Sequence, residues 1–274
     1  MNKRALLIAG GVILFILILI VAFKGKGGHV SVVPKPTSPA NASARALFEQ
    51  AQGLVKQGEL VKAKEAYREI VMDSPDFENI AGVQQDLENL NMRILFSNVV
   101  TPKTAEHVVQ TGDTLGKIAK KYATTVELIK KSNNLQNDVI RVGQKLRVWT
   151  GSFNIYVDKS QNILMVKDGD EVLKVYNVST GSNNSTPVGK YTITTRLVDP
   201  VWFNKGIVLP PESPQNVLGT RWLGFDLPGY GIHGTIDPEA IGQQVTAGCV
   251  RMRNEDVEEL YSFIPVGTEV TIVD

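Results

Sequence analysis

The chain has 274 residues but only one cysteine and three histidines, which excludes several kinds of chemistry. A single cysteine cannot form an intramolecular disulfide, so cysteine content says nothing about the redox compartment. Zinc sites need several Cys, His or acidic ligands close together, and His29, His107 and His233 are far apart in the sequence. Gly189 and Lys190 are not followed by Ser or Thr, as a phosphate-binding loop requires. We therefore expect neither a metal nor a cofactor.

The chain also lacks a surplus of either charge. It has 29 Lys and Arg against 28 Asp and Glu, a net charge of +1. Proteins that bind nucleic acid usually concentrate positive charge, so the composition argues against a nucleic-acid partner. The length is more than one typical domain needs, and a multidomain architecture is expected.

Long hydrophobic runs are absent except at the N-terminus. Residues 5–23 form an uncharged apolar run of 19 residues, which as a helix spans roughly 28 Å, close to the thickness of a bilayer core. A cleaved signal peptide normally has a shorter apolar region, followed by a small-x-small cleavage site. No such site follows Val21 here. We predict that residues 1–24 are a cytoplasmic start and an uncleaved transmembrane anchor. Basic residues lie on both sides of the apolar run, so charge alone does not set its orientation.

The next two segments differ sharply in composition. Residues 25–42 are rich in Gly and Pro and indicate a flexible or extended linker. Residues 43–97 have apolar side chains at spacings of three and four, which predicts two helices separated at Gly58, and a third from about Glu78 to Phe96. The arrangement of Ala63, Tyr67 and Pro75 resembles a single tetratricopeptide repeat. The segment suits a spacer and a protein-docking module equally well.

Residues 106–150 predict a compact strand–helix–helix–strand unit. A strand at His107 leads into a turn at Gly112, Asp113 is expected to cap the next helix, and Thr125 begins a second helix. A strand around Leu146 closes a unit of roughly 43 residues, near the lower limit for an independent domain. The order and turn residues of this unit resemble a LysM module, which implies binding of N-acetylglucosamine-containing glycans. The expected glycan contacts are Gly112, Asp113, Thr114, Asn134 and Leu135.

From residue 152 to residue 274 the apolar pattern changes to a period of two, which predicts strands. Pro210, Pro211 and Pro214 mark a long loop, because strands rarely include proline. One helix is expected from Asn254 to Phe263. These residues therefore predict a mainly-β domain with Gly- and Pro-rich connections.

This last domain contains the cysteine, Cys249, sixteen positions after His233. A thiol becomes a good nucleophile when a neighbour removes its proton, and imidazole is the usual helper. Gly248 precedes Cys249 and Gly234 follows His233, and glycine allows backbone N–H groups to approach a developing oxyanion. A lone cysteine in another context would be read as a small buried core residue.

The residues Ile232–Thr235 followed by Ala247–Met252 resemble the catalytic signature of the YkuD-type L,D-transpeptidases. The segments Val178–Gly181, Thr186–Tyr191 and Asn216–Phe225 agree in the same order, and the resemblance covers about residues 153–273. Many members have His at the position of Ala247, so no second histidine can assist catalysis in this chain.

The resemblance implies that Cys249 is the nucleophile and His233 its base, oriented by the backbone carbonyl of Gly234. It points to the N–H groups of Gly248 and Cys249 as the oxyanion hole. The substrate-binding residues are expected to be Arg251, Thr235 and Trp222.

Together these features predict a membrane-anchored enzyme with its LysM and catalytic domains outside the cytoplasm. Its partner is peptidoglycan, as stem peptide and as glycan, and its product a 3→3 cross-link in the cell wall. The acceptor of the acyl group can be an amine, water or a protein lysine. A non-catalytic wall tether and a cysteine peptidase are the competing hypotheses.

Overall fold

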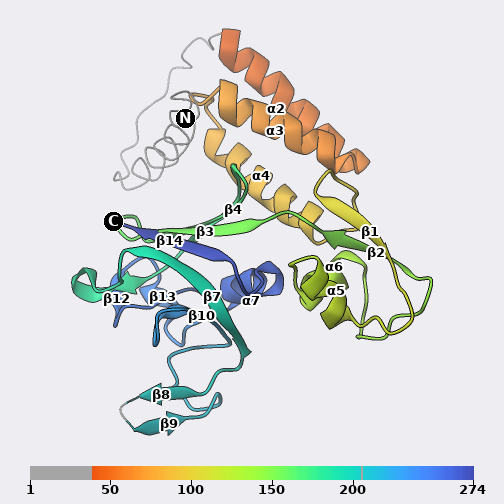
Figure 1. Cartoon of the computed structure of the whole chain (residues 1–274). Coiled ribbons are helices and arrows are strands. Elements are labelled where there is room, and N and C mark those ends of the chain that lie inside the picture. The colour runs from red at the N-terminus through yellow and green to blue at the C-terminus, as the bar shows by residue number, and fades with distance from the viewer. Residues whose placement is uncertain (1–38, 205) are drawn as a thin grey trace, which may run out of the picture. The chain divides into compact units, whose positions relative to one another are not determined.

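The computed structural model describes residues 39–204 and 206–274, which divide into two compact units between Leu90 and Asn91 (Figure 1). The predicted anchor and most of the predicted linker lie outside the described residues. Within the described ranges, no helix combines the length and the apolar character that crossing a bilayer requires.

The first unit is helical, as the spacing of its apolar residues predicted. Its helices are α2 (Pro39–Gln57), α3 (Leu60–Asp73) and α4 (Ile80–Leu95), the last of which continues into the second unit. Ala51 of α2 and Ala63 of α3 have no exposed surface, so small side chains allow the two helices to pack closely. Gly58 occupies the turn between them with a φ of +80°, a conformation that favours glycine.

The second unit begins with the small strand–helix–helix–strand segment. It comprises β1 (Thr104–Val108), α5 (Leu115–Lys121), α6 (Val126–Ser132) and β2 (Lys145–Trp149), and the two strands pair antiparallel. The predicted order of elements is confirmed.

The predicted cap of the first helix in this segment is wrong by one residue. The Oγ1 of Thr114, not the carboxylate of Asp113, accepts a hydrogen bond from the N–H of Lys117. Asp113 instead accepts a hydrogen bond from the N–H of Gln110 at 2.8 Å and lies 2.9 Å from Nε2 of His107. Asp113 therefore closes the turn before the helix, and Thr114 caps the helix itself.

The rest of the second unit is mainly β, as predicted. An eight-stranded sheet has the order β13-β11-β10-β7-β14-β3-β4-β5. Its strands are β3 (Phe153–Asp158), β4 (Ile163–Asp168), β5 (Glu171–Asn177), β7 (Gly189–Val198), β10 (Arg221–Phe225), β11 (Gly231–His233), β13 (Val250–Arg251) and β14 (Glu269–Val273). The predicted helix is present as α7 (Asn254–Phe263), and β6 (Thr180–Gly181) pairs with β12 (Gln244–Thr246) beside the sheet.

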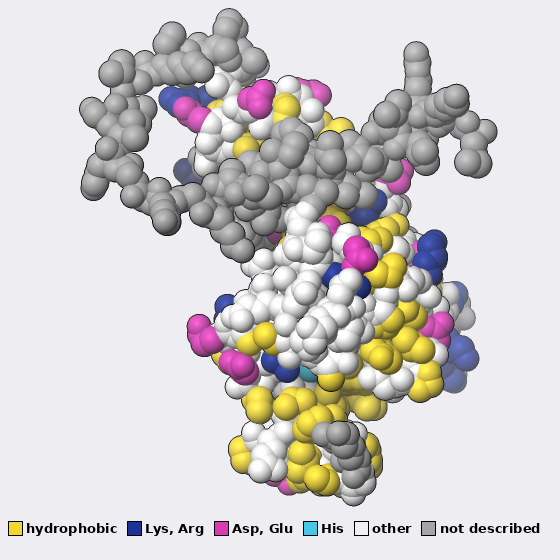
Figure 2. Space-filling model, turned by 90° about the vertical axis from the view of Figure 1, so that its left-hand side faces the viewer, with side chains coloured by type: hydrophobic (Ala, Val, Ile, Leu, Met, Phe, Trp, Pro, Cys, Tyr) yellow, Lys and Arg dark blue, Asp and Glu magenta, His cyan; other side chains and the backbone are white. Residues whose placement is uncertain are grey.

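A short hairpin that the sequence did not predict precedes the proline-rich loop. Strands β8 (Trp202–Asn204) and β9 (Ile207–Leu209) have three residues each, too few for a period of two to be recognised. The hairpin exposes large apolar side chains, and Figure 2 shows hydrophobic groups gathered on this lower lobe of the molecule. The exposed residues are Val201, Phe203, Ile207 and Val208.

The small segment and the large sheet share one hydrophobic core. Leu128 of α6 and Trp149 of β2 belong to the same buried cluster as the inner residues of the sheet, and Met92 and Leu95 at the end of α4 join it. A hydrogen bond of 2.5 Å from Oγ1 of Thr125 to the backbone oxygen of Ser262 adds a polar link to α7. The two segments are therefore packed as one body.

Arg147 of β2 is the main polar contact at this junction. Its guanidinium is buried, and it donates to the backbone oxygens of Val99 at 2.7 Å, Leu95 at 3.0 Å and Ile94 at 3.2 Å. The last carbonyls of a helix have no partners within it and carry partial negative charge, so a cation is well placed there. Burial lowers the pKa of Arg147 to about 10, which still leaves it charged at neutral pH.

We expect Arg147→Ala to lower the free energy of unfolding by about 3 kcal/mol, because it leaves the backbone oxygens of Val99 and Leu95 without this donor. Denaturant titration of the full-length protein measures this change. Lys145→Ala on the same strand is the control, since Lys145 makes only an exposed ion pair with Glu106 at 3.0 Å and its loss should cost ~1 kcal/mol or less. Equal effects of the two substitutions would contradict the assignment.

Candidate active site

The two predicted catalytic residues are brought together by a pair of parallel strands. In the pairing of β11 with β13, Ile232 is opposite Val250 and His233 is opposite Arg251. Cys249 is the residue immediately before β13, so it lies at the start of the strand next to that of His233. Neighbouring strands are about 4.8 Å apart, so one strand spacing separates two backbone positions that are sixteen positions apart in the sequence.

His233 is almost completely buried, with 3% of its surface exposed. Its Nδ1 lies 2.7 Å from the backbone oxygen of Gly234, the contact that the family resemblance implied. A carbonyl can only accept, so Nδ1 carries the proton and Nε2 is left as the basic nitrogen. The ring of Trp222 stacks against the imidazole with centroids 5.9 Å apart.

The surroundings of His233 and Cys249 keep both groups neutral near pH 7. Burial and, to a smaller extent, the charge of Arg251 lower the pKa of His233 to about 4, against the opposing effects of hydrogen bonds to the backbone of Gly234 and of Leu218. Burial also raises the pKa of the Cys249 thiol, more than the N–H of Gly231 and the charge of Arg251 lower it. The thiol therefore has to lose its proton as it attacks.

The loop that carries the thiol has a conformation that requires glycine. Gly248 has a φ of +130°, and a Cβ there would lie 2.8 Å from a ring carbon of Tyr230. The Sγ of Cys249 itself is 3.5 Å from the backbone oxygen of Gly229.

One of the two predicted oxyanion donors is already occupied. The N–H of Gly248 donates to Oγ1 of Thr246 at 3.1 Å, and the same hydroxyl donates to the backbone oxygen of Cys249 at 2.7 Å. The N–H of Cys249 has no partner among the residues that the structure describes. Of the two predicted oxyanion donors, only the N–H of Cys249 is therefore left without a partner among these residues.

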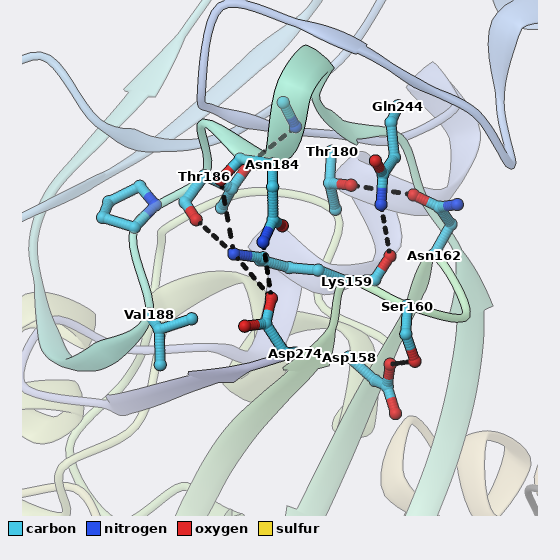
Figure 3. A network of polar contacts seen from close by, with 12 residues as sticks. Asp158, Lys159, Ser160, Asn162, Thr180, Asn184, Thr186, Val188, Gln244 and Asp274 are labelled. Carbon is cyan, nitrogen blue, oxygen red and sulfur yellow. Dashed lines mark hydrogen bonds and ion pairs between the residues drawn. The ribbon is translucent and has the colours of Figure 1, made fainter.

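A buried lysine, Lys159, holds the loop at Thr186 (Figure 3). Lys159 is 2% exposed, and its Nζ donates to the backbone oxygen of Thr186 at 2.8 Å and pairs with Asp274 at 3.0 Å. The loop that it holds contacts the thiol loop, since the Oγ of Ser182 donates to the backbone oxygen of Thr246 at 3.3 Å. The sequence did not predict the role of Lys159, because the residues next to it in the chain do not distinguish a buried lysine from a surface one.

Arg251, the predicted carboxylate-binding residue, lies near the thiol, and the Nε of its guanidinium is buried. Its backbone exchanges hydrogen bonds with Ser179 at 2.9 and 2.8 Å, which fixes the strand. Its side chain is half-buried, and Nε has no hydrogen-bond partner in the described part of the chain. Burial lowers the pKa of Arg251, whereas the charges of Asp237 and Cys249 raise it. A guanidinium near the thiol thus has an unused donor.

The other two predicted substrate contacts have different surroundings. Thr235 is 2% exposed, and its Oγ1 accepts a hydrogen bond from the N–H of Asp237 at 2.9 Å, so its side chain is part of the loop itself. Trp222 is half-buried and lies against His233. The geometry gives no support to a substrate contact by Thr235, and it assigns Trp222 first to the support of the imidazole.

Asn254 is a further residue that the sequence did not single out. Its side-chain amide forms hydrogen bonds to the backbone of Thr235 at 3.0 and 2.9 Å, next to the carbonyl that orients His233. Asparagine near the start of a helix is typical of a cap. Because this role is so common, the sequence alone does not indicate a second role for Asn254.

The predicted glycan contacts lie in two loops of the small segment. Gly112 has a φ of +86° in the turn after β1, and Asn134 has a φ of +55° after α6. Gly112, Thr114 and Asn134 are exposed, and Asp113 and Leu135 are partly exposed. Their role in glycan binding stays a prediction.

Comparisons with known proteins agree with this arrangement. The YkuD family model, an L,D-transpeptidase catalytic domain, matches residues 152–272, and the LysM domain matches residues 107–149. The chain is 42% identical to the putative L,D-transpeptidase YqjB of Bacillus subtilis over 44% of this chain and 70% of that protein. It is 31% identical to the putative L,D-transpeptidase YkuD of the same organism over 60% of this chain and 96% of that protein.

Among solved structures, an L,D-transpeptidase from Mycobacterium tuberculosis aligns with a TM-score of 0.40 and 20% identity, over 48% of this chain and 63% of that one. A score this low adds nothing to the argument, which rests on the two Bacillus relatives and the matched domains. The chain belongs to the YkuD family of L,D-transpeptidases, and it carries the catalytic domain of that family next to a LysM domain.

Proposed function

We propose that the protein is a peptidoglycan L,D-transpeptidase that uses Cys249 as its nucleophile and transfers the acyl group to an amine. The observation that carries this proposal is the pairing of β11 with β13, which puts the thiol beside a histidine whose Nδ1 is held by the carbonyl of Gly234. The matched catalytic and LysM domains support the same substrate, since both are typical of proteins that act on the cell wall.

In the first half of the reaction, Sγ of Cys249 attacks the carbonyl carbon between meso-diaminopimelate and the terminal D-alanine of a stem peptide. Nε2 of His233 takes the thiol proton, and the N–H of Cys249 stabilises the oxyanion. The C–N bond then breaks, His233 gives the proton to the departing amine, and a thioester remains on Cys249.

In the second half, the amine of another stem peptide attacks the thioester. His233 takes a proton from that amine and returns it to the sulfur as the thioester bond breaks. An acceptor amine from diaminopimelate gives a 3→3 cross-link, water gives carboxypeptidase activity, and a protein lysine gives protein anchoring. We assign the guanidinium of Arg251, whose buried Nε has no partner among the described residues, to a carboxylate of the stem peptide, because guanidinium binds carboxylates with two parallel hydrogen bonds.

The remaining segments give the enzyme its location. We propose that residues 5–23 anchor the chain in the membrane with the N-terminus in the cytoplasm and the enzyme outside, where its substrate is. The LysM domain holds glycan strands through the loops at Gly112 and Asn134. The helical segment, residues 43–97, separates the anchor from the enzyme or binds a partner protein.

Acylation by a carbapenem tests the nucleophile, because the strained lactam is an acyl donor that a reactive thiol opens. We expect the full-length protein to gain the mass of one carbapenem, and Cys249→Ala and Cys249→Ser to gain none. Intact-protein mass spectrometry measures the adduct. Both variants should still sediment with purified peptidoglycan.

Two results would refute this part of the proposal. An adduct that persists in Cys249→Ala would put the reactive group elsewhere. Absence of an adduct on the native protein, with sedimentation retained, would favour a non-catalytic wall tether.

The pH dependence of acylation tests the neutral state of the site. His233 acts as a base only when unprotonated, so its pKa of about 4 predicts that the rate falls on the acid side around pH 4, not around pH 6.5. Stopped-flow acylation from pH 3.5 to 8 measures this limb. Loss of most of the rate between pH 7 and 6 would instead indicate a preformed ion pair of thiolate and imidazolium.

A further inference from the structure

One peptide group connects His233 to the side chain of Asn254, the first residue of α7. The carbonyl of Gly234 accepts from Nδ1 of His233 at 2.7 Å, and the N–H of the next residue, Thr235, donates to Oδ1 of Asn254 at 3.0 Å. These two groups belong to the same planar amide and point in opposite directions from it. Asn254 therefore holds the far side of the amide that orients the imidazole.

Two further hydrogen bonds fix the asparagine itself. Its Nδ2 donates to the backbone oxygen of Thr235 at 2.9 Å, and its Oδ1 also accepts from the N–H of Thr220 at 3.3 Å. The amide side chain thus uses both its donor and its acceptor, and it links the loop after β11 to the residue before β10. A side chain that has only hydrogen-bond donors or only acceptors cannot make all three bonds.

Two glycines leave the space that this contact needs. A Cβ at Gly234 would lie 2.2 Å from Oδ1 of Asn254, and a Cβ at Gly219 would lie 2.3 Å from the same atom. Real Cβ atoms do not approach this closely, so either side chain would displace the asparagine. The glycine after the histidine is therefore required by its contact with Asn254.

We propose that Asn254 is the positioning residue for His233 and acts through the Gly234–Thr235 amide. In many hydrolases a carboxylate holds the catalytic histidine directly. Here a neutral carbonyl takes that place, and the hydrogen bond on the N–H side of the same amide polarises the carbonyl and strengthens its bond to Nδ1. Asn254 thereby keeps the proton on Nδ1 and the lone pair on Nε2. The consequence for rate rests on the proposed acyl transfer, whereas the consequence for the tautomer does not.

The competing explanation is that Asn254 only stabilises the start of α7 and the loop. That explanation predicts a lower melting temperature in Asn254→Ala with an unchanged imidazole. The positioning role predicts a change at the imidazole itself. Asn254→Asp separates the two further, because aspartate keeps the acceptor for Thr235 and Thr220 and adds a negative charge.

The experiment uses ¹⁵N-labelled full-length protein and its Asn254→Ala and Asn254→Asp variants. Two-bond ¹⁵N–¹H spectra report the tautomer and the pKa of His233, and stopped-flow acylation by a carbapenem reports the rate. We expect Asn254→Ala to give a mixture of tautomers and an acylation rate about 10- to 100-fold lower. With a stem tetrapeptide, kcat should fall and KM should change little. Asn254→Asp should restore the Nδ1–H tautomer and raise the pKa of His233.

Asn133 provides a matched control in the LysM domain. Its side chain also bridges backbone groups, with Nδ2 donating to the oxygen of Ile129 at 2.7 Å and Oδ1 accepting from the N–H of Arg147 at 2.7 Å. Asn133→Ala should lower the melting temperature but leave the His233 spectrum and the rate on a soluble tetrapeptide unchanged.

The outcomes separate this inference from the proposed function. A native tautomer and a native pKa of His233 in Asn254→Ala overturn the inference, whatever the melting temperature. If the native protein forms no adduct, the proposed function fails, and the tautomer in Asn254→Ala still decides the role of Asn254.

Discussion

The parallel pairing of β11 with β13 is the contact on which the site depends, yet it includes only two residue pairs. So short a pairing is weak alone, and surrounding contacts reinforce it at both ends. The N–H of Met252 donates to the backbone oxygen of His233 at 2.8 Å, and Ser179 pairs with Arg251 on the other side. Lys159 holds the loop at Thr186, which contacts the thiol loop, and Asn254 holds the histidine loop. Each reacting side chain is thus held by backbone geometry that a remote polar side chain fixes.

Burial explains why the site works with uncharged partners. A histidine that is 3% exposed loses the solvation that an imidazolium needs, and the nearby guanidinium of Arg251 disfavours the cation further. A carboxylate behind His233 would reverse this balance, whereas the carbonyl of Gly234 orients the ring with no net charge. In the proposed reaction, the imidazolium therefore forms only while a negative charge develops at the sulfur and the substrate oxygen, when it stabilises the transition state most.

The sequence predicted the helix at residues 254–263 and singled out His233 and Cys249, which the pairing of β11 with β13 brings together. Both follow from local periodicity and from a glycine-rich pattern around reactive side chains. It did not predict which neighbours hold them. Lys159 and Asn254 act through backbone atoms distant in the chain, and such contacts leave no spacing to recognise. The sequence also did not predict that the N–H of Gly248 donates to the hydroxyl of Thr246, a contact that occupies this donor. The helix cap was predicted at Asp113 and not at Thr114, because aspartate is an equally good capping residue.

The core shared by Leu128, Trp149 and the sheet bears on how such proteins diversify. A small binding module that folds independently can be gained or lost without destabilising the neighbouring domain. Here a transplanted module would have to bring its own Arg147 for the end of α4 and an aromatic side chain that stacks on Phe153, as Trp149 does. Recombination at the short connection between residues 149 and 152 would expose half of a hydrophobic interface on each product. The LysM domain and the catalytic domain would therefore have to be exchanged together.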